Sequence, residues 1–384
     1  MKKKVKTIIS LSFVIIFLLS FFMIGCKFIA VSNAFASAES LTSANGMCVM
    51  ESTTGRVLYS KNENKQMPMA STTKIMTAIT AIENCRNLDE EFEISPKAVG
   101  ISGTSIYLRK GETMSMRDLL YGLMLVSGND ASVAIGEKIS GDTKKFVELM
   151  NMTAKKIGAY NTHFDNTHGL DSENHYTTAY DLALITSYAL HNDTFKEIVS
   201  TKNTKIINKD GKTRYLKNKN KLLYLLEGCN GVKTGFTNDA GRCLVSSCER
   251  DGMNIVCVVL NCRPMFEESQ VLLNKAFEEY KMVDLTSGYN YQQSIPVIEG
   301  RQEEISIGTK EHYYYPLRAD EEKNIEYEYS IQKSIEAPIT KGSEVGEVKI
   351  FINKNLQFSE KIYTMESVRR KSIWDKIKFL IDEW

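Results

Sequence analysis

Three short strings, widely separated along the chain, constrain the fold more than any other feature. They are Ser-Thr-Thr-Lys at residues 71–74, Ser-Gly-Asn at residues 127–129 and Lys-Thr-Gly at residues 233–235. Each string alone occurs by chance in many proteins. All three in this order, in a chain that begins like an exported protein, are improbable as coincidence. They predict a fold that gathers them around an active-site serine needing no histidine.

The first string supplies a nucleophile and a base. Residues three apart on a helix share one face, so Ser71 and Lys74 become neighbours at the start of a helix. A serine hydroxyl is a weak nucleophile until a base takes its proton, and lysine can act as that base when burial or nearby cations lower its pKa. The alternative is a helix cap with a solvated lysine.

The second string predicts a tight loop between helices, with Gly128 easing the turn. The hydroxyl of Ser127 can relay a proton between Lys74 and a leaving amine. Asn129 can hold Lys74 through its carbonyl oxygen and a substrate amide through its other atoms. Alone, this string is an ordinary turn or cap.

The third string is predicted to lie on a strand that edges the site. Lys233 supplies a second cation that lowers the pKa of Lys74. Thr234 can hydrogen-bond a substrate carboxylate, and Gly235 lets a substrate backbone approach closely.

The N-terminus resembles an export signal. Lysines precede an apolar run over residues 8–25, and Ala34 and Ala36 offer a signal-peptidase site, so we expect residues 1–36 to be removed. An uncleaved anchor and a lipoprotein cleaved before Cys26 are the alternatives. Without residues 1–36, acidic side chains outnumber basic ones, which argues against nucleic-acid binding.

The cysteines do not predict a metal site or a disulfide framework. No Cys-x-x-Cys pair occurs, and the mature part has an odd number of cysteines. We therefore expect buried apolar cysteines on strands, with one disulfide involving Cys243 or Cys257 as the alternative. No metal or cofactor is expected.

Strand patterns at both ends of the first two thirds of the chain enclose helical patterns, which predicts an α+β domain with an antiparallel sheet over residues 37–287. Expected elements include a hairpin over residues 47–59, helices capped by Ser115 and Thr178, and a helix over residues 265–282.

Alternating patterns from Ile295 onward predict a small all-β domain over residues 288–364, with turns at residues 341–342 and 345–346. Apolar residues from Ile373 to Trp384 fall on one helical face beside several basic residues. We expect an amphipathic helix over residues 365–384 that lies on an anionic membrane surface. Packing of this helix on the protein body is the alternative.

These motifs and their flanks resemble the serine-type D-alanyl-D-alanine carboxypeptidases, the low-molecular-mass penicillin-binding proteins. The similarity covers nearly the whole chain, most clearly at residues 68–77, 126–131, 167–170, 176–183 and 231–237. It implies a β-lactamase/transpeptidase-like domain with a helical subdomain. Thr167 departs from the family, which usually has proline there, and we expect His168 to hold a loop near the cleft.

The resemblance implies the chemistry as well. The substrate would be a peptidoglycan stem peptide ending in D-Ala-D-Ala, met at the outer face of the cytoplasmic membrane. Ser71 would form an acyl-enzyme with the help of Lys74 and Ser127, and Asn129, Lys233, Thr234, Gly235 and Phe236 would bind substrate. The backbone N–H groups of Ser71 and Phe236 would form the oxyanion hole, and penicillins would acylate Ser71.

Three other functions are alternatives to this one. A class A β-lactamase needs a Glu-x-x-Leu-Asn string after the second motif, and none occurs before Lys233. An endopeptidase that cuts cross-links on the same scaffold remains open. A wall-binding protein with a vestigial site is disfavoured because all three strings are intact.

Overall fold

The computed structural model describes residues 42–286, 293–375 and 377. The expected signal peptide at residues 1–36 and the expected domain boundary at residues 287/288 lie outside the described residues.

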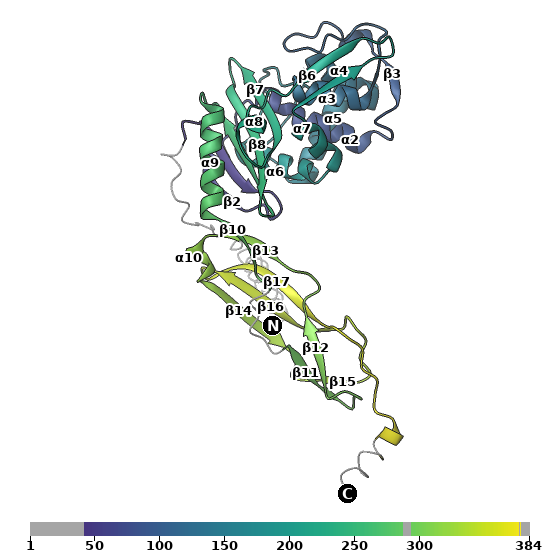
Figure 1. The fold of residues 1–384 in the computed structure, drawn as a ribbon, viewed down its shortest axis with the longest axis vertical. Helices are drawn as coiled ribbons and strands as arrows, with labels where there is room; N and C mark the ends of the chain where they lie inside the picture. The colour runs from purple at the N-terminus through teal and green to yellow at the C-terminus, as the bar shows by residue number, and fades with distance from the viewer. Residues whose placement is uncertain (1–41, 287–292, 376, 378–384) are drawn as a thin grey trace, which may run out of the picture. The chain divides into compact units, whose positions relative to one another are not determined.

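The first part of the chain is organised around a five-stranded antiparallel sheet (Figure 1). Its strands, in spatial order, are β2 (Val57–Lys61), β1 (Gly46–Glu51), β9 (Met253–Leu260), β8 (Gly241–Arg250) and β7 (Cys229–Thr237). The expected hairpins β1–β2 and β8–β9 are confirmed. Since β9 lies between β1 and β8, the two ends of this domain's sequence meet in the middle of the sheet.

Helices inserted between β2 and β7 cover one face of the sheet (Figure 1). They are the 3-10 turns η3 (Ala70–Thr73) and η4 (Pro96–Ala98), and the helices α2 (Lys74–Asn84), α3 (Met116–Leu125), α4 (Asn129–Ser140), α5 (Thr143–Ile157), α6 (Ala179–Leu190) and α7 (Asp193–Ser200). The short helix α8 (Leu222–Leu225) also lies between β2 and β7 in the sequence, but its Leu222 packs in the core on the opposite face of the sheet. The predicted caps are confirmed, because Ser115 and Thr178 each accept a hydrogen bond from the backbone N–H three residues on.

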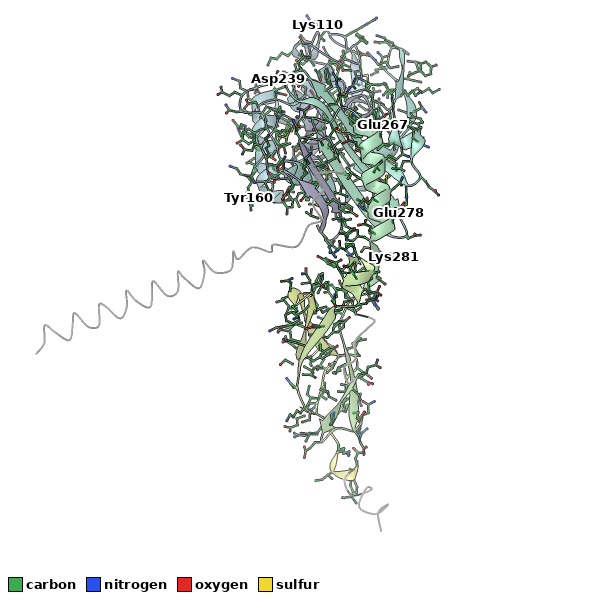
Figure 2. All side chains as sticks on the ribbon, turned by 90° about the vertical axis from the view of Figure 1, so that its left-hand side faces the viewer. Lys110, Tyr160, Asp239, Glu267, Glu278 and Lys281 are labelled. Atoms are coloured by element: carbon green, nitrogen blue, oxygen red, sulfur yellow. The ribbon has the colours of Figure 1, made fainter. Side chains whose placement is uncertain are left out.

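Alternation along β9 builds a core on each side of the sheet. Val256 and Val258 face the helices, whereas Ile255 and Val259 face α9 (Met265–Glu279). Figure 1 shows α9 alongside β8, and Figure 2 marks its ends at Glu267 and Glu278. A β-strand with both faces buried reads as a continuous apolar run, as this one does.

The predicted helix over residues 265–282 is too long. α9 ends at Glu279, and Lys281 begins the strand β10 (Lys281–Asp284). Hydrogen bonding to β13 (Tyr314–Leu317) explains the change, because Lys281 lies opposite Leu317.

Two small two-stranded sheets accompany the helices. They are β3 (Glu91–Glu93) with β4 (Thr113–Ser115), and β5 (Asn203–Ile207) with β6 (Thr213–Lys217). A buried ion pair joins Arg214 of β6 to Glu112, which precedes β4, at 2.6 Å. The β5–β6 pair is thereby held against the segment that leads through β4 into α3.

The C-terminal part has its own core, formed by apolar residues from Leu285 to Val368. Its main sheet has the strand order β14-β16-β17-β12-β11-β15, beside the β10–β13 pair and the short helix α10 (Ala319–Glu322). The bounds of this sheet are β14 (Ile325–Ile331), β16 (Glu344–Ile352), β17 (Asn355–Thr364), β12 (Glu304–Gly308), β11 (Ser294–Ile298) and β15 (Ile335–Glu336). The mixed first domain and the all-β second part agree with the predicted fold class.

The turn predicted at residues 345–346 lies inside β16. The register of β16 with β17 shifts between Glu344 and Gly346. A β-carbon on Gly346 would lie 2.4 Å from the carbonyl oxygen of Ser330, so this glycine marks close strand packing at a bulge.

The C-terminal helix does not begin at residue 365. Val368 is buried in the β-rich core and bridges to Ile339, and helical residues begin only at Ile373. Residues 376 and 378–384 of the predicted helix lie outside the described residues. Across the described ranges, no helix combines the length and apolar character needed to cross a bilayer.

Candidate active site

Ser71 and Lys74 are adjacent at the junction of η3 and α2. A 3-10 turn has three residues per turn, so residues i and i+3 lie one above the other. The Nζ atom of Lys74 lies 3.0 Å from Oγ of Ser71. Ser71 is half-buried and Lys74 is completely buried.

The turn that carries Ser71 is pressed between two other segments. Ala70, the residue before Ser71, has a left-handed φ of +48°. A β-carbon on Gly169 would lie 1.9 Å from the carbonyl oxygen of Ala70, and one on Gly235 would lie 3.1 Å from the backbone nitrogen of Ser71. Glycine at both positions therefore lets the loop at residue 169 and strand β7 reach the nucleophile's turn.

The amino group of Lys74 contacts two further oxygens. It lies 2.7 Å from Oδ1 of Asn129 and 2.6 Å from the carbonyl oxygen of His168. Together with Ser71 Oγ, these contacts account for three hydrogen bonds to one nitrogen. They fix the direction in which the Lys74 side chain points.

Electrostatics favour a neutral amine at this site. Burial, followed by the charges of Lys233 and Lys219, holds the pKa of Lys74 well below its usual value. Burial and the charge of Lys219 also lower the pKa of Lys233, to about 7. Three lysines from separate segments thus act together: the charge of Lys219 lowers the pKa of both other lysines, and the charge of Lys233 lowers the pKa of Lys74.

Asn129 connects Lys74 to a neighbouring loop. Its side-chain Nδ2 donates to the carbonyl oxygen of Ser102 at 2.6 Å, and its backbone N–H donates to that of Thr104 at 2.7 Å. One N–H of this amide group is therefore used within the protein, and the expected contact of Asn129 with a substrate amide stays a prediction. Asn129 acts as a clamp between Lys74 and the loop.

The next residue, Asp130, holds the same loop. Its carboxylate accepts hydrogen bonds from the hydroxyl of Ser105 at 2.6 Å and from the backbone N–H groups of Ile106 and Leu108 at 3.0 Å. These bonds satisfy a carboxylate that is almost completely buried.

Ser127 lies between α3 and α4 with a left-handed φ of +70°. It is 4% exposed, and its Oγ atom has no hydrogen-bond partner within the described part of the chain. An unpaired buried hydroxyl is costly, so such groups are rare and call for an explanation. Use of this hydroxyl during a reaction is one such explanation.

Strand β7 lies next to the turn that carries Ser71. Lys233 is 1% exposed and its Nζ atom donates to the carbonyl oxygen of Thr234 at 2.8 Å. Thr234 is half-buried, whereas Phe236 is 60% exposed and lies under the guanidinium of Arg242 at 5.7 Å. The strand thus presents a buried cation, a hydroxyl-bearing residue and an exposed ring in succession.

The ring of His168 serves the local loop. Burial, with the charge of Lys74, lowers the pKa of His168 to about 4, so the ring is neutral near pH 7. Its Nδ1 accepts a hydrogen bond from the backbone N–H of Leu170 at 3.2 Å.

Sequence reasoning missed two participants. Lys219 influences both other lysines, and the carbonyl of Ser102 occupies the Asn129 amide. Lys219 could have been suspected because it precedes β7 in a basic stretch, residues 217–221. A backbone carbonyl leaves no signal in the sequence.

Two protein-family models match this chain. Residues 33–263 match the family model described as D-alanyl-D-alanine carboxypeptidase. Residues 277–370 match the model described as the C-terminal domain of penicillin-binding protein 5.

Individual relatives match along most of their length. The chain is 31% identical to D-alanyl-D-alanine carboxypeptidase DacF of Bacillus subtilis, covering 96% of this chain and 98% of that relative. The structure resembles penicillin binding protein 5 of Haemophilus influenzae with a TM-score of 0.71 and 26% identity, covering 86% of this chain and 98% of the other. It also resembles DacD of Francisella tularensis, with a TM-score of 0.68 and 27% identity over 90% of this chain and 98% of the other.

Proposed function

Because this chain belongs to the D-alanyl-D-alanine carboxypeptidase family of penicillin-binding serine peptidases, we propose that Ser71, Lys74 and Ser127 are its catalytic residues. The chain is a serine-type D-Ala-D-Ala carboxypeptidase, and its substrate class is the peptidoglycan stem peptide. The observation that carries the assignment of residues is the 3.0 Å contact between Lys74 Nζ and Ser71 Oγ, at a site where burial and neighbouring lysines lower the pKa of Lys74.

In the acylation step, Oγ of Ser71 attacks the carbonyl carbon of the penultimate D-alanine while neutral Lys74 takes the hydroxyl proton. The proton passes through the hydroxyl of Ser127 to the leaving nitrogen as the peptide bond breaks. Free D-alanine departs, and Ser71 carries the shortened peptide as an ester. The unpaired, buried Oγ of Ser127 supports this relay.

In the deacylation step, water attacks the ester and the proton returns to Ser71 through the same groups. The backbone N–H groups of Ser71 and Phe236 bind the developing oxyanion. Removing one donor of this kind generally costs a factor of roughly 10² to 10³ in rate. One of these donors lies on η3 and the other on β7. The close approach of Gly235 to the Ser71 nitrogen supports an oxyanion hole formed by these two elements.

Strand β7 binds the substrate in this proposal. Lys233 and Thr234 receive the terminal carboxylate, and Gly235 and Phe236 contact the peptide backbone. Thr234 is half-buried and Lys233 is buried. These positions support a binding mode in which the carboxylate contacts the Thr234 side chain and is attracted by the positive charge of Lys233.

The assignment is tested by intact mass spectrometry after reaction with benzylpenicillin. We expect one covalent adduct that maps to the peptide containing Ser71. Ser71→Ala should lose the adduct and D-alanine release while keeping its melting temperature. Ser95→Ala, which removes only the cap of η4, should keep both activities. An adduct on another residue would overturn the assignment.

A membrane role for the C-terminal end is part of the same proposal. Ile373 and Trp374 are 72% and 76% exposed where helical structure begins, and several basic residues lie nearby in the sequence. An exported enzyme acting on peptidoglycan would be held near its substrate by such a helix. Sedimentation with anionic phospholipid vesicles tests it. Full-length protein should bind, Trp374→Ser should bind several-fold more weakly, and equal binding by both would contradict the proposal.

A further inference from the structure

Two cysteines face each other across the strands that carry the third motif. Cys229 of β7 lies opposite Cys248 of β8 in the antiparallel register, next to a shift of that register between Cys229 and Gly231. Glu249 N–H donates to the Gly228 carbonyl at 2.9 Å, and Cys229 N–H donates to the Leu226 carbonyl instead of across the strands. The two cysteines therefore form a non-hydrogen-bonded pair, the closer of the two kinds of opposed pair in such a sheet.

This geometry suits a disulfide. Cα atoms of a non-hydrogen-bonded antiparallel pair are about 4.5 Å apart, and disulfides join Cα atoms separated by about 4.4–6.8 Å. Directly opposed side chains also leave the sheet on the same face. Cys248 belongs to the core that also contains Leu272 and Leu273 of α9, and Cys229 packs against it.

No other pair of cysteines in the described strands is opposed in this way. Cys257 lies opposite a serine, which makes it only a diagonal neighbour of Cys248, and Cys243 lies opposite a glycine. Diagonal pairs are about 7–8 Å apart, beyond the reach of a disulfide without backbone movement. The structure thus favours neither Cys243 nor Cys257 as a disulfide partner, although the sequence made them candidates.

The two thiols have different surroundings. Cys248 is completely buried, whereas Cys229 is only half-buried. Hydrogen bonding to Cys248 lowers the pKa of Cys229, and the charges of Arg250 and Lys202 lower it further. The same hydrogen bond and burial raise the pKa of Cys248.

Arg250 is held in place beside this pair. Its guanidinium donates to the carbonyl oxygen of Glu227 at 3.0 Å and to Oδ1 of Asn274 at 3.1 Å. A half-buried thiol beside fixed positive charge, with a buried second thiol opposite it, is an arrangement that favours dithiol exchange.

We propose that Cys229 and Cys248 form a reversible cross-strand disulfide by exchange with an external disulfide. The Cys229 thiolate attacks one sulfur of the oxidant, forming a mixed disulfide and releasing one thiolate. Cys248 gives its proton to solvent, and its sulfur attacks the Cys229 sulfur and releases the second thiolate. Two protein thiols are oxidised and one external disulfide is reduced to two thiols.

The bond would close a loop over residues 229–248, which contains the Lys-Thr-Gly string and the turn between β7 and β8. Both cysteines pack in the core on the α9 side of the sheet, whereas the helices that carry the proposed catalytic residues pack in the core on the other side, so turnover should be unchanged. Closing a loop of this length restricts the unfolded chain, and we expect the melting temperature to rise by about 5–10 °C.

The test uses the full mature chain equilibrated with oxidised or reduced glutathione, then alkylated under denaturing conditions and mapped without reduction. Oxidised protein should lose two of the seven free thiols outside residues 1–41 and yield one cross-linked peptide joining Cys229 to Cys248. Cys85→Ser is the matched control, because Cys85 is half-buried and outside the sheet, and it should behave like the parent.

Two single variants separate the roles of the thiols. Cys248→Ser should accumulate glutathione on Cys229, whereas Cys229→Ser should resist oxidation and lose the rise in melting temperature. Retention of all seven thiols in oxidised parent protein, or a cross-link that maps to other cysteines, would overturn the proposal. Circular dichroism of each reduced variant establishes that it is folded before oxidation.

Discussion

Lys74 and Asn129 are joined by a hydrogen bond of 2.7 Å between Nζ and Oδ1, although they belong to different helices. Asn129 is itself fixed to the carbonyl of Ser102. The position of the proposed base is therefore set by a neutral amide rather than by a carboxylate. A neutral partner orients the amine without stabilising its protonated form.

Asn129→Asp should slow acylation at neutral pH. A carboxylate at the same distance raises the pKa of Lys74, so less neutral amine is available to take the Ser71 proton. We expect the rate constant for acylation by benzylpenicillin at pH 7 to fall by about 10- to 100-fold and to recover in part near pH 9. Asn151→Asp, at an amide bonded to the backbone of Phe164, serves as control. An unchanged rate at pH 7 would show that Lys74 is not the base.

Lys219→Gln should shift the pH dependence of acylation. Lys219 is one of the charges that lower the pKa of Lys74, after burial and Lys233. Removing it raises that pKa, so the acidic limb of the rate profile should move to higher pH by up to about one unit. Stopped-flow acylation from pH 5 to 9 measures the shift. Lys217→Gln, whose amine lies over the ring of Tyr224, should leave the profile in place.

Gly235→Ala should block the site while preserving the fold. The added methyl would lie 3.1 Å from the backbone nitrogen of Ser71 and from the carbonyl oxygen of Met69. These contacts displace the proposed oxyanion donor, and we expect acylation to fall by roughly 10²-fold or more. Thermal melting should change little. Gly136→Ala meets only an ordinary 3.4 Å contact with Phe146 and should remain active.

Local signals in the sequence predicted much of the fold. The cap residues Ser115 and Thr178, and the alternation on either side of the β8–β9 turn, each report on a few neighbouring residues. The insertion of β9 beside β1 depends on contacts between the two ends of the domain, which no local pattern records. The same limit explains why a turn was wrongly predicted at Gly346. Glycine is needed there because the neighbouring strand lies too close for a side chain.

The candidate site shows the same division. The spacing of Ser71 and Lys74 predicted their contact, because helical geometry fixes it. The second hydrogen bond of Asn129 and the carbonyl of His168 could not be predicted, because they depend on where loops come to rest. Lys219 lowers the pKa of Lys74 and Lys233 through its charge. This effect could not be predicted from the sequence because it depends on how the fold places the three lysines.

Stability should rise with pH because of Lys233. Burial and Lys219 lower its pKa to about 7 in the folded state, against 10.5 for an ordinary lysine. Between these values the unfolded chain binds a proton that the folded protein does not, so raising the pH favours folding. Relative to Lys233→Met, the parent should gain on the order of 3 kcal/mol in unfolding free energy between pH 7 and 10. Urea titrations at both pH values measure it, and parallel changes in the two proteins would contradict the shifted pKa.

Arg214→Leu should destabilise the domain and impair the site together. The ion pair of Arg214 with Glu112 is buried, and Arg214 also donates to the carbonyl oxygens of Ile106 and Tyr107 in the loop that Asp130 holds. Removing one partner leaves a buried carboxylate without its counter-charge, which typically costs about 3–5 kcal/mol.

The pair Glu112→Leu/Arg214→Leu separates the charge from the packing. Since apolar replacement of a whole buried ion pair is often nearly neutral, the double variant should regain most of the lost stability. Denaturant titration measures the unfolding free energies, and benzylpenicillin acylation reports on Asn129 through the shared loop. If the single variant matched the parent in both measurements, the ion pair would have no part in fixing the loop.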